Sequence, residues 1–241
     1  MSKQTLYGQT HSRVVIQPSC VRIGGRTVTN EQAKMVAKIQ TMDKAARLKA
    51  IENLYADFHW VFKDSRYVVV RIAVARASDM YHDQLAHDEN WRVRRAVAHT
   101  STKYHDQLVY DTEWAVRLVV THASTTYHHI LANDESRWVR EAVARFSTRY
   151  HHILKDDTNC LVRRAVAETS TRFHGQLMND EHWTVRLAVA LASTKYHDQL
   201  VNDTHRSVRV AIAKASDVYH HILKDDEDLR VRNTVKNYKE E

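Results

Sequence analysis

The stretch DENWRVRRAVAHTSTKYHDQLVY, residues 88–110, returns in related form every 23 residues along the rest of the chain. It begins with an aspartate, and this aspartate recurs as Asp88, Asp111, Asp134, Asp157, Asp180, Asp203 and Asp226. A looser copy, one residue longer, begins at Asp64 and brings the total to about eight units. Self-similarity at a fixed period of roughly 20 to 50 residues is typical of solenoid proteins. The sequence therefore predicts a stack of similar units.

Each unit contains two segments whose apolar spacing is helical. Apolar residues follow the aspartate at five, eight, nine and often twelve positions, which places them on one face of a helix. The second segment begins at Ser or Thr, and its aromatic residue and leucine lie four residues apart, so we expect a short α or 3₁₀ helix there. Neither helix can bury its apolar face alone. We therefore predict an all-α solenoid of about eight two-helix repeats of 23 residues.

The first 41 residues differ from the repeats. Two β-prone runs flank Gly24-Gly25, a pattern that favours a hairpin, and Thr29 with Gln32 forms a capping box for a helix near residues 31–40. We expect a second helix over residues 42–62. The predicted domains are a basic N-terminal β-hairpin and cap helix, residues 1–41, and a repeat solenoid, residues 42–241.

The positive charge is concentrated near the N-terminus. Residues 1–50 contain nine Lys or Arg against two acids, which accounts for the whole net charge of +7, and the other 191 residues hold 27 basic and 27 acidic side chains. A cap can keep basic side chains on its outer face, so this segment is a candidate arm for nucleic acid or another acidic partner. The candidate binding residues in this arm are Arg13, Arg22, Arg26, Lys34 and Lys38.

The order of residues in the unit resembles a known repeat family. The unit has the order Asp, four residues, Val-Arg, two residues, Val-Ala, then Thr and a closing Leu. This order is similar to that of the leucine-rich repeat variant and, more broadly, of HEAT-type repeats, over roughly residues 64–236. This resemblance implies a right-handed superhelix of paired helices. The units here lack proline and are one residue shorter than that variant. Its founding type carries a cysteine-bound iron–sulfur cluster, but only Cys20 precedes the repeats here, so we expect no cofactor.

Three repeated columns are interpreted as scaffold. Six residues separate the arginine of a unit from its own aspartate, so we expect that arginine to pair with the aspartate of the adjacent unit. A histidine follows an aromatic residue in each unit, as in Tyr104-His105, and some units have a doublet such as His128-His129. Histidines of consecutive units are one helix packing distance apart, which is too far for them to share a zinc ion. We therefore expect no metal site and a surface or capping role for the histidines. The tryptophans Trp91, Trp114 and Trp183 share a column and are expected to pack against the next unit, although a stacking platform for bases is an alternative.

Two other columns are candidates for binding. The residue after the Ser-Thr pair is basic in Lys103, Arg149, Arg172 and Lys195, and this row could hold phosphates unless it is an ordinary solvated edge. On the long helix, apolar residues lie outside the core pattern, at Leu118, Leu187, Leu191 and Val210. Apolar side chains at such positions indicate a protein partner, provided that neighbouring units do not half-bury them.

These patterns predict a non-catalytic interaction or adaptor protein that binds a protein or a protein–nucleic acid assembly. The alternative is a nucleic-acid-binding solenoid that contacts DNA or RNA backbone phosphates without base specificity. The polar residues recur in every unit, so the sequence offers no unique catalytic constellation and predicts neither an enzyme nor a small-molecule substrate. The chain has no apolar run of the roughly 18 residues that a membrane helix needs, and no signal peptide, so we expect a soluble, cytoplasmic protein without a membrane partner.

Overall fold

The structure, a computed structural model, describes residues 15–17, 20–23, 26–53 and 56–238. The chain forms two compact units, Met1–Ala123 and Ser124–Glu241, and each is described by itself. The first unit contains the N-terminal segment and the earliest repeats, and the second contains repeats alone. The domain boundary predicted between residues 41 and 42 remains a prediction.

The first unit begins with a three-stranded antiparallel sheet. Its strands are β1 (Val15–Gln17), β2 (Cys20–Ile23) and β3 (Arg26–Val28), in that order. Ile23 pairs with Arg26, which matches the hairpin predicted around residues 24–25, positions that themselves lie outside the described residues. Helix α1 (Asn30–Thr41) follows, and Thr29 and Gln32 form the predicted capping box.

The second predicted helix, over residues 42–62, is shorter in the structure. Helix α2 (Lys44–Glu52) is capped at its C-terminal end by Asn53, and a 3₁₀ helix, η1 (Ala56–Val61), follows separately. Asp43 caps the start of α2 by accepting hydrogen bonds from two backbone N–H groups, those of Ala45 and Ala46. The side chain of Asn53 donates to the carbonyl of Lys49 at 2.9 Å, so a side chain satisfies a carbonyl in the last turn of α2, where the helix stops.

The repeats alternate long and short helices. In the first unit the long helices are α3 (Val68–Ala77), α5 (Trp91–Thr100) and α7 (Trp114–Ala123), and the short helices are α4 (His82–Leu85) and α6 (His105–Leu108), the latter preceded by the 3₁₀ helix η2 (Thr102–Tyr104). In the second unit the long helices are α9 (Arg137–Phe146), α11 (Cys160–Thr169), α13 (Trp183–Ala192), α15 (Arg206–Ala215) and α17 (Leu229–Lys236).

The short segments of the second unit join a 3₁₀ turn to one α-helical turn, as the spacing predicted. The 3₁₀ helices are η3 (Thr125–Tyr127), η4 (Thr148–Tyr150), η5 (Thr171–Phe173), η6 (Thr194–Tyr196) and η7 (Asp217–Tyr219). The α-helical turns are α8 (His128–Leu131), α10 (His151–Leu154), α12 (His174–Leu177), α14 (His197–Leu200) and α16 (His220–Leu223). Most of these segments begin at a serine whose side chain accepts a backbone N–H, as Ser170 does from Arg172.

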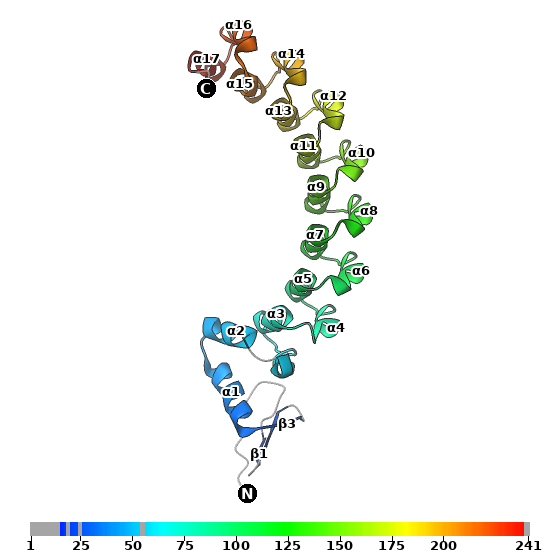
Figure 1. Cartoon of the computed structure of the whole chain (residues 1–241), viewed down its shortest axis with the longest axis vertical. Coiled ribbons are helices and arrows are strands. Elements are labelled where there is room, and N and C mark those ends of the chain that lie inside the picture. The colour runs from blue at the N-terminus through cyan, green and yellow to red at the C-terminus, as the bar shows by residue number, and fades with distance from the viewer. Residues whose placement is uncertain (1–14, 18–19, 24–25, 54–55, 239–241) are drawn as a thin grey trace. The chain divides into compact units, whose positions relative to one another are not determined.

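Stacking of neighbouring repeats makes the core. In the second unit the long helices pack side by side in one row, and the short helices form a second row beside them (Figure 1). In the repeat that begins at Asp134, the buried apolar residues are Val139, Ala142, Val143, Ala144 and Leu154. The positions predicted at five, eight and nine residues after the aspartate are buried, but the one predicted at twelve, Phe146, is 55% exposed, and Ala144, at ten, is buried instead. The all-α repeat solenoid is confirmed. Within the described ranges, no helix is both long enough and apolar enough to cross a membrane.

Candidate binding surfaces

An arginine–aspartate ladder joins consecutive repeats. The Arg140 guanidinium donates from Nε and Nη2 to the two carboxylate oxygens of Asp157, at 2.6 and 2.9 Å. Its Nη1 donates to the backbone carbonyl of its own Asp134 at 2.7 Å. The same geometry recurs in the pairs Arg71–Asp88, Arg94–Asp111, Arg163–Asp180, Arg186–Asp203 and Arg209–Asp226. The predicted pairing with the adjacent unit is therefore confirmed.

The ladder is scaffold because its charges are satisfied and enclosed. The side chains of Arg140 and Asp157 are 15% and 6% exposed. The hydrogen bond with Asp157 raises the pKa of Arg140 above its usual value, while burial acts in the opposite direction. A bidentate guanidinium–carboxylate pair of this kind fixes the register of two neighbouring units. These side chains leave no group for a ligand.

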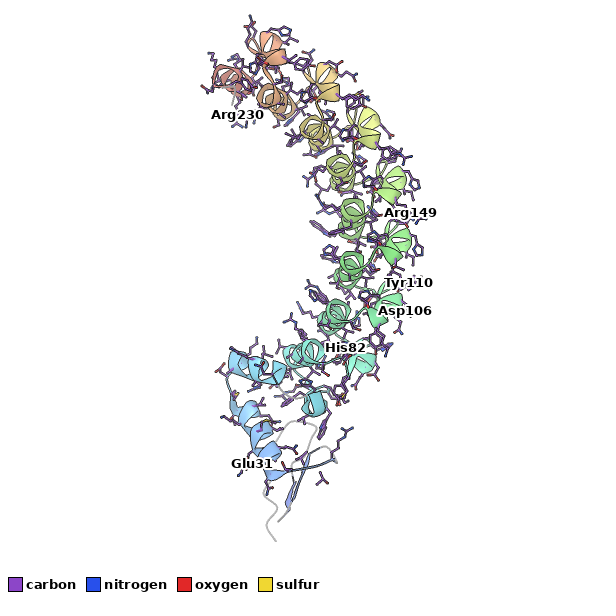
Figure 2. The ribbon with its side chains drawn as sticks, viewed as in Figure 1. Glu31, His82, Asp106, Tyr110, Arg149 and Arg230 are labelled. Atoms are coloured by element: carbon purple, nitrogen blue, oxygen red, sulfur yellow. The ribbon has the colours of Figure 1, made fainter. Side chains whose placement is uncertain are left out.

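The histidine column lies inside the protein, so its predicted surface location is wrong. His151 is fully buried, and its Nε2–H donates to the carbonyl of Ala144 at 2.7 Å. Ala144 is in the last turn of α9, where carbonyls lack helical partners. This bond caps the C-terminal end of α9, in agreement with the capping role that was the other prediction for the histidines. The same bond is made by His82, His105, His174, His197 and His220, and Figure 2 labels His82, the first residue of α4.

Burial governs the charge of one of these histidines. Removal of the His151 ring from water lowers its pKa, and the hydrogen bond to Ala144 opposes that change only in part. The second histidine of each doublet differs, because His152 is exposed and its Nδ1 hydrogen-bonds to the carbonyl of Arg149 at 2.9 Å. In the part of the chain that the structure describes, no group of three or more His, Cys, Asp or Glu could hold a metal ion.

One member of the histidine series was not recognised in the sequence. His59, in η1, is fully buried, and its Nε2–H donates to the carbonyl of Ile51 at 3.0 Å. Here eight residues separate the two partners, against seven in the regular repeats. The signal was present in the sequence, because His59 follows an aromatic residue, Phe58, and precedes His82 by one 23-residue period.

The predicted basic row is exposed, but each of its cations lies over a neighbouring ring. Lys103, Arg149, Arg172 and Lys195 stand 5.2 to 5.9 Å from the ring centroid of the aromatic residue that follows them. Figure 2 shows Arg149 on the short-helix side of the second unit and Arg230 on the long helix α17. Exposed acids such as Asp198 share the short helices with these cations. The row is therefore a mixed charged surface.

The cations predicted in the N-terminal arm have separate surroundings. Arg13 lies outside the described residues, and Arg22 is on β2. Arg26 is exposed and lies 5.1 Å from the Trp60 ring centroid. Lys34 and Lys38 are exposed on α1, and Lys34 is 3.7 Å from Glu31. The described members of this group do not converge on a common pocket.

Apolar side chains line the exposed face of α13. Trp183, Leu187 and Leu191 follow one another at intervals of one helical turn, and Leu191 is 69% exposed. Trp183 and Leu187 are half-buried, as is Val210 on the neighbouring α15, so Leu191 is the residue of this group that meets the condition of full exposure. These four residues are termed the α13 apolar face below. Leu118, the remaining predicted residue, is half-buried on α7 and belongs to the first unit.

Aromatic stacking holds Trp183 at this face. The ring of His205 lies parallel to the Trp183 ring, with centroids 4.0 Å apart and an interplanar angle of 11°. His205 also caps α15, because its side chain accepts the N–H of Ser207 at 3.3 Å. The sequence predicted that Trp183 packs on the next unit, with base stacking as the alternative, and its place beside the two leucines was missed.

A closed charge network borders the α13 apolar face on the side of α11. Glu168 lies 3.1 Å from Arg164 on its own helix and 2.8 Å from Arg145 on α9, and Arg145 also contacts Glu141 at 3.0 Å. Because these charges neutralise one another, the surface changes from paired charges on α9 and α11 to uncharged apolar groups on α13.

Comparison with known proteins supports the repeat fold. No protein-family model matches the sequence, and no curated protein matches it. A solved structure described as a leucine-rich repeat variant with a novel repetitive motif matches at 25% identity with a TM-score of 0.65, over 76% of this chain and 81% of that one. The chain shares the repeat-solenoid fold of that variant. Escherichia coli YibA also matches, at 16% identity with a TM-score of 0.49, over 82% of this chain and 98% of that one.

Proposed function

We propose that the protein is a non-catalytic interaction protein and that the α13 apolar face binds a protein partner. The observation that carries this proposal is the 69% exposure of Leu191 in line with Leu187 and Trp183. A long apolar side chain in water costs free energy that burial under a partner would recover, at about 25 cal/mol per Å². Contiguous apolar groups with a polar border are typical of protein interfaces.

The recurring polar residues support a binding function over catalysis. The arginines, aspartates and first histidines of the repeats are engaged in the ladder and in capping bonds, as Arg140, Asp157 and His151 illustrate. Catalysis requires an acid, base or nucleophile gathered in one place. A solenoid instead provides a long surface on which the variable positions select the partner.

The proposal is tested by recovery of partners from an extract of the source cells. The variant Leu187→Gln/Leu191→Glu should lose a protein that the wild-type chain recovers, and nuclease treatment should leave that recovery unchanged. The matched control is Ile153→Glu/Ile222→Glu, since both isoleucines are exposed on the short helices. Equal recovery by the wild type and the α13 variant would contradict the proposal.

A second copy of the chain is an alternative occupant of the same face. Size-exclusion chromatography with light scattering separates the two cases. A dimer that the α13 substitutions dissociate, together with no other recovered protein, would assign the face to self-association. Circular dichroism of both variants checks that the repeats remain folded.

Nucleic-acid binding through the basic row and the N-terminal cations is the second candidate function. The exposure of Lys103, Arg149, Arg172 and Lys195 supports it. Contacts of this kind weaken steeply between about 50 and 200 mM salt, because bound counterions are released. Absence of DNA or RNA retention at the lower salt concentration would eliminate it.

A further inference from the structure

A second exposed surface lies in the first unit and carries positive charge. The three long helices α3, α5 and α7 contain no acidic residue. Their ladder arginines Arg71 and Arg94 are paired with Asp88 and Asp111 in the loops. The arginines outside the ladder are therefore the ones that determine the charge of the exposed face.

Three such arginines lie on neighbouring helices. Arg92 and Arg95 are exposed one turn apart on α5, and His99 follows after another turn. Arg76 is exposed in the last turn of α3, which packs directly against α5. Across the described residues, no carboxylate lies within ion-pair distance of Arg76, Arg92 or Arg95. Together with Trp91, these three arginines are termed the α5 basic face.

The second unit shows what the same helix positions look like when their charge is neutralised. Arg164 and Glu168 of α11 occupy the positions that Arg95 and His99 occupy on α5, and they form an ion pair at 3.1 Å. Arg145 of α9 likewise has two glutamate partners. The repeat thus accommodates glutamate at these positions, and the α5 basic face lacks it.

An aromatic ring belongs to the same face. The guanidinium of Arg92 lies over the indole of Trp91, 4.7 Å from the ring centroid, and Trp91 is half-buried. A flat cation on an indole offers a surface on which a nucleobase can stack, and the unpaired arginines offer charge for phosphates. Trp114 stands at the equivalent position of α7 and is 40% exposed.

We propose that the α5 basic face binds single-stranded nucleic acid. Arg76, Arg92 and Arg95 contact backbone phosphates, and Trp91 with Arg92 stacks against an unpaired base. An acidic peptide would satisfy the charges but would leave the indole unused. A duplex would offer phosphates, but its bases are already stacked on one another. This site is separate from the α13 apolar face and does not depend on it.

The test is fluorescence anisotropy of a labelled oligothymidine of about 20 nucleotides with the full-length chain. The variant Arg76→Gln/Arg92→Gln/Arg95→Gln should bind at least about tenfold more weakly at roughly 50 mM salt, and the slope of log affinity against log salt should fall by about 2. The control Lys214→Gln/Lys224→Gln/Arg230→Gln removes the same charge from exposed positions of the second unit and should change affinity less than about threefold.

Four results would overturn the proposal. These are no binding by the wild type at the lower salt concentration, unchanged binding by the α5 variant, an equal loss in the control variant, and equal affinity for a duplex of the same length. Poly-glutamate that competes as well as the oligonucleotide would reassign the face to an acidic peptide. The substituted arginines are exposed, and circular dichroism melting should show both variants folded like the wild type.

Discussion

At the scale of the residue, one aspartate serves two neighbouring units. The carboxylate of Asp157 accepts two hydrogen bonds from the guanidinium of Arg140 in the preceding repeat. Its Oδ1 also accepts a hydrogen bond from the backbone N–H of Asn159 at 2.8 Å, at the start of the next long helix. The carboxylate therefore links the long helix of one unit to the start of the long helix in the next. This double use is a physical reason for the aspartate to recur in every unit.

Replacement of this aspartate should destabilise the fold. Asp157→Ala should lower the free energy of unfolding by about 3–5 kcal/mol, because it leaves the largely buried Arg140 charge without its partner. Urea unfolding followed by circular dichroism measures the change. The adjacent Asp156, whose side chain is 57% exposed beside Lys155, provides the control, and Asp156→Ala should cost at most about 1 kcal/mol. Equal losses in the two variants would show that the ladder contributes no more than a surface ion pair.

A buried histidine should make stability depend on pH. The pKa of His151 is lowered in the folded protein, so the unfolded chain binds more protons and stability falls as pH drops below the ordinary value of about 6.5. Its contribution is complete above that pH and is lost as pH falls toward the lowered folded pKa. His151→Gln should reduce the difference in unfolding free energy between about pH 7.5 and 5.5. His152→Gln, at the exposed neighbour, should reduce it less, and the reverse order would contradict the role of burial.

At the scale of the element, most long helices begin with a side-chain cap and are followed by an extended serine. Asn159 accepts the N–H of Leu161 at 3.0 Å and begins α11, and Ser170, in extended conformation, follows the last turn. The histidine of the short helix then donates a hydrogen bond to a backbone carbonyl in the last turn of the long helix, as His174 does to Ala167 at 2.8 Å. Side chains therefore close both ends of α11.

Loss of the N-terminal cap should have a measurable but smaller effect than loss of the ladder. Asn159→Ala should cost about 1 kcal/mol, because the first turn of α11 then has a backbone donor without its side-chain acceptor. Thermal unfolding reports this as a lower melting temperature. Thr158→Ala, one residue earlier and exposed, should leave the melting temperature nearly unchanged. A cap that contributes nothing would give the two variants the same melting temperature.

At the scale of the whole molecule, each repeat is stabilised by its neighbours. In the second unit α17 packs against α15 and keeps Val231 fully buried. In a stack of this kind stability is approximately the sum of repeat terms and interface terms between neighbours. The two compact units should each unfold cooperatively, and their variants can be interpreted separately.

Removal of the last helix should weaken the second unit. A chain truncated after Glu227 loses the interface with α15 and exposes apolar surface that α17 covers, although Asp226 remains to pair with Arg209. Loss of the burial of Val231 alone should cost roughly 1.5–3 kcal/mol. The control lacks only residues 239–241. A urea midpoint unchanged by the longer truncation would show that the α15–α17 interface contributes nothing.

The sequence by itself determined everything that is local or periodic. The 23-residue period gave the number of units, the apolar spacing identified three core positions of each long helix, and the distance between Asp and Arg identified the ladder partner in the adjacent unit. The capping box of Thr29 and Gln32 was readable because its two bonds join residues three apart. These features depend on helix geometry and on one repeated interface, and both are the same in every unit.

Only the tertiary structure decided which polar columns are buried and which charges have partners. Burial of His151 and the bond from its ring to Ala144 follow from the way a short helix folds back onto a long one, which residue type does not specify. Likewise, the i,i+4 spacing of Glu141 and Arg145 is visible in the sequence, but the contact of Arg145 with Glu168 depends on the packing of α9 against α11. Among the described residues, no carboxylate reaches Arg95 from a neighbouring helix. Whether a charge is free depends on side chains of adjacent units. The candidate binding faces therefore became visible only when the repeats were stacked.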